Sequence, residues 1–263
     1  MMRINVFEFE DFKWFPDFLR TGMMDYLRYF FKVTGYYSPV VPILEECLEA
    51  MNTGKIVDLC SGSGGPVLEI QNKIYTNYGR KTQVALTDLY PNKQACQYNS
   101  KQSNRDILCI HDSVDAMEVP VSLIGTRTLF SSIHHFDPNQ VRRILADAVR
   151  SKQGIAIFDI GEKNLVAVIG ILIFHPILIL LLTPFFRPFH IYTIVFTYFI
   201  PLIPLFTVWD GIMSILRLYR ADDLQKIADS LIADGFHWRS GYVKNRLGLR
   251  VVYLTGIYTE SKS

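Results

Sequence analysis

The sequence predicts an α/β protein built on a doubly wound, mostly parallel sheet. Between residues 54 and 163, short apolar segments that end in polar residues alternate with amphipathic helical segments. One strand-to-helix turn, K-I-V-D-L-C-S-G-S-G-G over residues 55–65, is rich in glycine and serine. Turns of this kind bind ligands at the carboxyl ends of parallel strands, because a backbone without Cβ atoms can approach a ligand closely.

Composition sets limits on the partners of this chain. Its 263 residues suit one large or two small domains. The net charge of +2 is too small to indicate a nucleic-acid partner, which usually requires a clustered basic face. The mean hydropathy of +0.17 is high for a soluble protein, and the excess is concentrated in one segment. The four cysteines form no C-x-x-C pair, so we expect reduced thiols and neither a zinc site nor a disulfide framework.

Residues 1–53 are expected to form a helical lid in front of the first strand. Amphipathic spacing predicts one helix over Pro16–Lys32, and a second over Pro39–Met51 with Ser38 as its N-cap. The alternatives are a helix that merely caps the sheet or one that lies on a membrane surface.

An acid, Asp58, closes the first predicted strand, and a carboxylate there would repel a pyrophosphate but suit an ammonium group. The stretch resembles motif I of the class I S-adenosylmethionine-dependent methyltransferases, (D/E)-x-G-x-G-x-G. Asp58, Gly62 and Gly64 match, and Cys60 replaces the first glycine. The resemblance implies a Rossmann-like fold of seven strands with the last antiparallel. It also implies S-adenosylmethionine as cofactor, its methionine moiety held by Asp58 above the glycines. An ordinary strand-to-helix turn is the alternative.

Two further strand ends extend the expected cofactor site. The second strand, Gln83–Leu89, places Asp88 to accept hydrogen bonds from ribose hydroxyls, with Leu89 beside it as a further candidate. A polar helix is expected over Asn92–Ser103. The third strand covers residues 107–110, and the resemblance implies that Asp112 and Ser113, which follow it, contact the adenine. An Asp-Ser pair is also a common turn.

The fourth predicted strand, Leu129–Ile133, is followed by His134 and His135, and a helix starts at Asp137-Pro138. Histidine titrates near neutral pH, so either ring could act as a general base for an acceptor or orient the substrate. A structural, hydrogen-bonded histidine is the alternative. The fifth strand, residues 154–160, is an apolar run typical of a buried parallel sheet.

Residues 164–208 interrupt this pattern with a hydrophobic helical hairpin. Leu165–Phe186 and Ile191–Val208 contain no acid or base, and each is about as long as a bilayer core is thick. We expect membrane association with the catalytic domain in the cytoplasm. Four prolines leave open whether the hairpin spans or lies in the interface. A hydrophobic lid or dimer interface in a soluble protein is the alternative.

Residues 209–263 are expected to complete the sheet. A helix is predicted up to Asp234, followed by antiparallel strands at Trp238–Val243 and Arg250–Thr255. Resemblance to a pocket-lining segment of some family members makes Asp210 and Arg217 candidate pocket residues. An ordinary salt-bridged surface is the alternative for either residue.

The sequence therefore predicts a membrane-associated S-adenosylmethionine-dependent methyltransferase. Its expected acceptor is a small apolar or lipid-like molecule. The rival interpretation is a non-catalytic, membrane-tethered binding or scaffold protein. RNA methylation is disfavoured by the mild charge and the absence of a basic aromatic groove.

Overall fold

A computed structural model describes residues 3–4, 6–62, 64–91, 96–98, 100, 106–161 and 163–259. The chain falls into two compact units. The sheet unit comprises Gly35–Gly161 and Tyr219–Ser263, and the hairpin unit comprises Met1–Thr34 and Glu162–Leu218.

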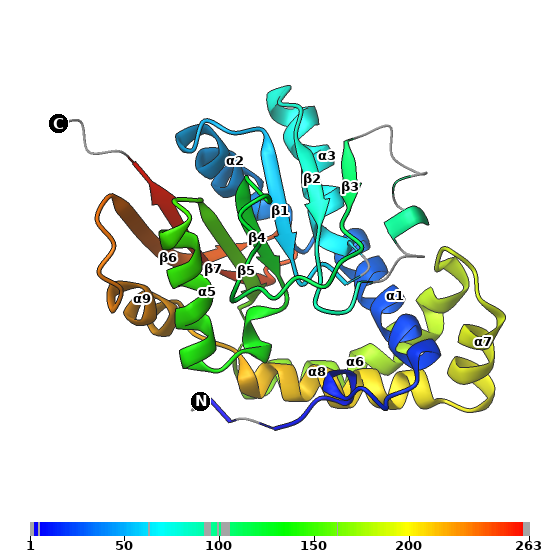
Figure 1. Ribbon diagram of the computed structural model, residues 1–263. Helices are drawn as coiled ribbons and strands as arrows, with labels where there is room; N and C mark the ends of the chain where they lie inside the picture. Colours follow the sequence, from blue (N-terminus) through cyan, green and yellow to red (C-terminus); the bar gives the residue numbers. More distant parts are fainter. Residues whose placement is uncertain are drawn as a thin grey trace. The chain divides into compact units, whose positions relative to one another are not determined.

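The sheet unit is organised around seven strands in the order β3-β2-β1-β4-β5-β7-β6 (Figure 1). The strands β1 to β5 pair in parallel, and β7 runs antiparallel between β5 and β6. This confirms the predicted fold, a class I methyltransferase-like sheet with one antiparallel strand. The strands are β1 (Lys55–Leu59), β2 (Gln83–Leu86), β3 (Ile107–Cys109), β4 (Thr126–Phe130), β5 (Ile155–Ile160), β6 (Phe236–Lys244) and β7 (Arg250–Tyr258).

Helices cover both faces of this sheet. On one face, α5 (Pro138–Arg150) and α9 (Ala221–Asp229) pack their buried apolar residues against alternate residues of the central strands. On the other face lie α2 (Val41–Ala50) and α3 (Gly65–Tyr78) (Figure 1). Because helices cover both faces, nearly every residue of β1, β2, β4 and β5 is buried, whereas the edge strand β3 is partly exposed.

Some helix boundaries differ from the sequence prediction. The helix expected from Pro39 begins at Val41, after a 3-10 turn, and Ser38 makes no capping bond because its hydroxyl instead accepts from Lys73 Nζ. The last helix ends at Asp229 rather than at Asp234. By contrast, Asp137 caps α5 with a complete capping box, as its position before a proline at the first helical turn indicates. Most of the helix predicted over residues 92–103 lies outside the described residues.

Three strands also end earlier than predicted, β3 by one residue, at Cys109. Strand β2 ends at Leu86. The Thr87 N–H still donates to the Asp58 carbonyl of β1 at 2.9 Å, but the Thr87 carbonyl accepts from the Ser61 N–H of the glycine loop at 2.9 Å. Strand β4 ends at Phe130, where Ser131 has a left-handed backbone (φ 47°) that no strand can continue. The histidines that follow therefore lie in a 3-10 turn, Ile133–His135.

The prediction of reduced thiols is wrong for two of the cysteines. Cys96 and Cys109 form a disulfide with 5.9 Å between their Cα atoms. The edge strand β3 and the segment that follows β2 bring them together, and their spacing along the chain contains no motif that would reveal the pairing. Cys47 and Cys60 are free thiols.

The hairpin unit contains α1 (Asp17–Thr34), α6 (Leu165–Leu182), α7 (Ile191–Ile194) and α8 (Leu202–Arg217). Within the described residues, one helix, Leu165–Phe185, is long and apolar enough to cross a membrane. The segment that follows is apolar enough to cross a membrane only if two helices are taken together, Ile191–Phe199 and Leu202–Arg217. The axes of these two helices are bent by 80° relative to each other. The second predicted span is therefore broken, and α8 continues past Val208 to Arg217.

Asp210 and Arg217 bind the N-terminal segment to α8 within the hairpin unit. The Asp210 carboxylate accepts from the backbone N–H groups of Phe9 at 2.8 Å and Glu10 at 3.2 Å. The Arg217 guanidinium forms ion pairs with Glu8 at 3.0 Å and Asp11 at 2.8 Å. Within the hairpin unit, Asp210 thus binds two backbone N–H groups of the N-terminal segment, and Arg217 binds two of its acids.

Candidate functional site

The glycine loop between β1 and α3 has the backbone expected of a ligand-binding turn. Gly62 (φ 52°) and Gly64 (φ 74°) are left-handed, and Gly64 is the N-cap residue of α3. A Cβ atom added to Gly62 would meet nothing within 4 Å, so this part of the backbone faces open space. The loop can therefore lie directly against a ligand.

Cys60 adopts a left-handed backbone as well (φ 56°), at the position where the related motif has a glycine. The conformation is thus kept although the residue differs, at a steric cost that glycine would not have. Burial raises the pKa of the Cys60 thiol, with the carboxylates of Asp88 and Asp58 adding to the effect. A thiol that stays neutral is a poor nucleophile, which indicates a structural role for this side chain.

Asp58 is buried beneath the loop, with 3% of its surface exposed. Its Oδ1 atom accepts a hydrogen bond of 2.6 Å from Thr128 Oγ1 on the adjacent strand β4. Burial raises the pKa of Asp58 to about 7, although the hydroxyls of Thr128 and Ser61 oppose the shift. A nearby cation would restore the ionised form, so this carboxyl is suited to pair with an ammonium group.

Asp88 joins the end of β2 to the glycine loop. Its Oδ2 atom accepts from the Gly62 N–H at 2.8 Å, and its Oδ1 atom accepts from the Tyr90 N–H at 2.9 Å. Each carboxylate oxygen can accept a further hydrogen bond, so Asp88 remains able to bind hydroxyl groups. The two acids predicted from the first and second strands are therefore brought to one edge of the sheet.

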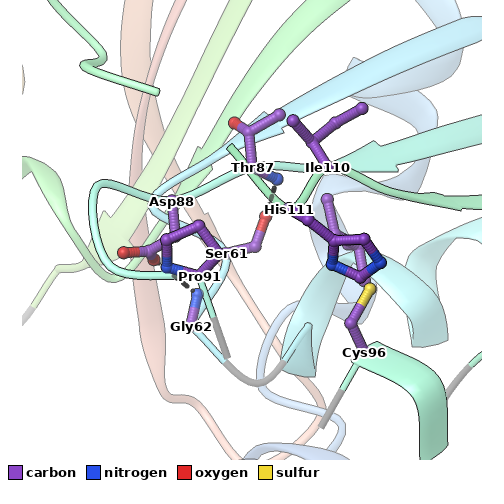
Figure 2. A pocket seen from close by; sticks show the side chains of 9 residues that line it. Ser61, Gly62, Thr87, Asp88, Pro91, Cys96, Ile110 and His111 are labelled. Atoms are coloured by element: carbon purple, nitrogen blue, oxygen red, sulfur yellow. Dashed lines mark hydrogen bonds between the residues drawn. The ribbon is translucent and has the colours of Figure 1, made fainter. Parts of the chain in front are cut away.

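A pocket opens between this loop and the end of β3. In Figure 2, Asp88 points toward Gly62, while the sulfur of Cys96 lies beside the His111 ring on the opposite wall. Thr87 N–H donates to Ser61 Oγ at 3.1 Å across the base of the pocket. The lining residues are Ser61, Gly62, Leu86, Thr87, Asp88, Pro91, Cys96, Ile110 and His111.

The remaining predicted cofactor residues lie on the loops next to this pocket. Leu89 is 45% exposed. Ser113 Oγ donates to the Leu89 carbonyl at 2.7 Å, and the Val114 N–H donates to the Asp88 carbonyl at 2.9 Å. The loop after β3 is thus bonded to the loop after β2, which keeps Asp112, an exposed residue, close to the same edge of the sheet.

His134 is held by a buried acid that the sequence prediction missed. The Asp159 Oδ2 atom lies 2.8 Å from His134 Nδ1 and accepts from the His134 backbone N–H at 3.2 Å. Asp159 Oδ1 accepts from the Ile160 N–H at 2.7 Å. With Asp159 ionised, the tautomer that donates from Nδ1 places the imidazole lone pair on Nε2. The His135 ring lies 4.3 Å from the His134 ring between centroids.

A signal for Asp159 was present in the sequence. It is the acid within the apolar run G-I-A-I-F-D-I, and a carboxylate in a buried strand requires a hydrogen-bonding partner. What the run could not reveal is the identity of that partner. The partner becomes evident only when β4 and β5 pair and the turn after β4 lies over the end of β5.

Comparison with solved structures supports the fold. The structure of the plantazolicin methyltransferase BpumL in complex with SAH resembles this chain with a TM-score of 0.52 at 8% identity, over 93% of this chain and 91% of that one. No protein-family model matches the sequence, and no curated protein matches it. At this identity the likeness shows a common fold.

Two further structures resemble the chain more weakly. Magnesium protoporphyrin IX methyltransferase (ChlM) from Synechocystis PCC 6803, with bound SAH, gives a TM-score of 0.45 at 11% identity, over 84% of this chain and 82% of that one. LepI in complex with SAM gives 0.44 at 15% identity over 78% of this chain, which spans 43% of the LepI chain. Neither likeness supports a conclusion about activity.

Proposed function

We propose that this protein is a membrane-associated methyltransferase that uses S-adenosylmethionine and acts on a small apolar or lipid-like acceptor. The observation that carries the proposal is the hydrogen bond from Gly62 N–H to Asp88, which joins the glycine loop to the acid after β2. Folds of this kind bind a nucleoside through two features. One is a turn that needs left-handed glycines, and the other is an acid at the end of the second strand.

The residues at this edge of the sheet fit the cofactor. Asp58 would pair with the ammonium group, Asp88 would accept from the ribose hydroxyls, and Leu89, Asp112 and Ser113 would contact the base. The open space in front of Gly62 leaves room for the cofactor against the loop. The chemistry that S-adenosylmethionine supplies is a methyl group activated by a sulfonium.

His134 is the proposed general base. Asp159 would position its ring and stabilise the imidazolium that forms when Nε2 takes a proton from the acceptor. This role favours a hydroxyl or another acceptor that must lose a proton, because a neutral amine already has a lone pair for attack. His135, whose ring is close by, would orient the acceptor.

Calorimetric titration with S-adenosylmethionine and S-adenosylhomocysteine tests the cofactor site. Asp88→Ala is expected to weaken binding at least about tenfold, or about 1.4 kcal/mol. Asp106→Ala, which removes an exposed carboxylate in front of β3, is the matched control and should bind like the wild type. If the folded wild-type protein binds neither compound, the methyltransferase proposal fails and the scaffold interpretation is preferred.

Transfer of a labelled methyl group into a lipid extract tests the base. His134→Gln and Asp159→Asn should each lower turnover by about 100-fold or more without changing cofactor affinity. The control is His237→Gln, which alters an exposed histidine on β6. Full turnover in His134→Gln would assign the ring a structural role only.

A further inference from the structure

The outer face of α6 is apolar and exposed over the whole helix. Leu172, Ile173 and Phe174 are 58%, 51% and 61% exposed, and three successive residues cover about 200° of a helix circumference. The stripe of a helix surface that one partner helix covers is narrower than 200°. Between Asn164 and Trp209 the sequence contains a single charged residue, Arg187. Such a face suits a surrounding of acyl chains better than contact with one helix.

The base and the tip of the hairpin can be located from contacts inside the hairpin unit. α8 runs antiparallel along α6, since Gly211 lies against Ile171 while Ile203 shares a buried cluster with Ile179. At the base, Lys163 Nζ donates to the Leu218 carbonyl at 2.5 Å. The opposite end is the turn at residues 183–190.

Helix α1 packs against the tip half of this hairpin. The rings of Tyr26 and Phe30 lie 5.6 and 5.3 Å from the His175 ring. Tyr29 contacts Phe185 beyond the end of α6, and the Arg28 guanidinium donates to the Arg187 carbonyl at the tip. Along α1, Tyr26, Tyr29 and Phe30 face the hairpin, whereas Asp17 and Lys32 are exposed.

The connection of α1 to the rest of the chain decides how the hairpin can enter a membrane. α1 ends at Thr34, and the next residue, Gly35, already belongs to the sheet unit. Arg28, which contacts the tip, is separated from Thr34 by about 9 Å of helix. A hairpin that crossed the bilayer would place its tip about 30 Å from the side on which it entered. The contact with α1 is therefore incompatible with a spanning hairpin.

We propose that the hairpin inserts into one leaflet only, with α6 parallel to the membrane plane. The exposed face of α6 contacts the acyl chains, and α1 with its charged residues stays on the aqueous side. Base and tip both remain at the membrane surface, a depth typical of interfacial helices. This inference rests on the membrane association in the proposed function and specifies its geometry.

Depth measurements on the full-length protein bound to phosphatidylcholine and phosphatidylglycerol vesicles test the inference. Ile169→Cys, Ile173→Cys and Leu180→Cys place a fluorescent label along one face of α6. The wild type, treated in the same way, shows how much label its own free thiols take up. Val33→Cys, on the exposed face of α1, is the control position. Quenching by lipids with nitroxides at shallow and deep positions gives the depth of each label.

Equal, shallow depths at the three α6 positions, with the Val33 position accessible to aqueous quenchers, are the expected result. Depths that differ by about 16 Å between residues 169 and 180, the helix rise between them, would overturn the in-plane orientation while leaving membrane association intact. Failure of the unlabelled wild type to float with the vesicles would overturn both the in-plane orientation and the membrane association. Cofactor binding by that same protein would show that the methyltransferase proposal survives.

Discussion

The two units of this protein expose different kinds of residue. In the sheet unit, Leu145 of α5 is fully buried, whereas Arg142, Arg143 and Arg150 of the same helix are exposed. In the hairpin unit, Leu172 and Leu181 of α6 are 58% and 61% exposed, whereas Asp210 and Arg217 are each 5% exposed. The sheet unit thus has the distribution that water imposes, whereas α6 of the hairpin unit carries apolar side chains on its surface in addition to those in the buried cluster. The proposed membrane association rests on this difference between the two surfaces.

The largest effect is expected when the apolar face of α6 is given charge. Ile169→Lys, Ile173→Lys and Leu180→Lys together should lower vesicle binding more than about 1000-fold, since each charge moved into hydrocarbon costs about 2.5 kcal/mol. Vesicle flotation measures the change. Val33→Lys on α1 is the control and should bind as the wild type does. Unchanged vesicle binding by the triple variant would show that the exposed face of α6 does not contact the membrane.

The next effect tests the conventional core of the sheet unit. Arg127 on β4 and Asp147 on α5 form a buried ion pair of 2.6 Å, with both side chains 1% exposed. Arg127→Ala leaves a buried carboxylate without this partner and should lower the free energy of unfolding by about 3 to 5 kcal/mol. Arg150, which pairs with the same carboxylate, is 69% exposed, so Arg150→Ala should cost less than about 1 kcal/mol. Urea denaturation compares them, and equal losses would contradict the role of burial.

A pH-dependent effect is expected from Asp58. Its pKa is raised from 3.8 to about 7 in the folded state, so the native protein holds a proton there that the unfolded chain releases above pH 3.8. This contribution to stability is present below pH 3.8 and is lost as the pH rises toward 7, by up to about 4 kcal/mol.

Asp58→Asn should remove that dependence. Between pH 5 and 8, without cofactor, the stability of the wild type should fall relative to the variant in urea denaturation. Asp106→Asn, at an exposed carboxylate, should follow the wild type. Parallel curves for Asp58→Asn and the wild type would show that Asp58 is ionised throughout.

The smallest effect concerns the backbone at Cys60. Cys60→Ala keeps the left-handed conformation in a residue with a Cβ atom, whereas Cys60→Gly removes the steric cost. Both variants lose the thiol, so the glycine variant should be about 1 kcal/mol more stable than the alanine variant. Thermal denaturation of the pair measures this difference. The opposite order would show that the loop relaxes around a side chain.

Much of the fold could be predicted because its signals are local. The capping box at Asp137 and the apolar periodicity of α5 lie within one turn or one helix. The glycine loop and Asp88 are also recognisable from residue type and from their place after a strand. Strand ends were less predictable. The residues after Leu86 and Phe130 leave the strands through contacts with segments far away in the sequence or through an unusual backbone angle.

The sequence by itself determined the order of strands and helices, the position of the glycine loop and the existence of an uncharged hairpin, because each follows from the spacing of apolar residues and glycines. Only the tertiary structure decided that Asp159 holds His134, that Cys96 meets Cys109 and that α1 packs against the tip of the hairpin. These pairings join residues of separate segments. Their formation depends on how strands and helices pack, which no local pattern of residues specifies.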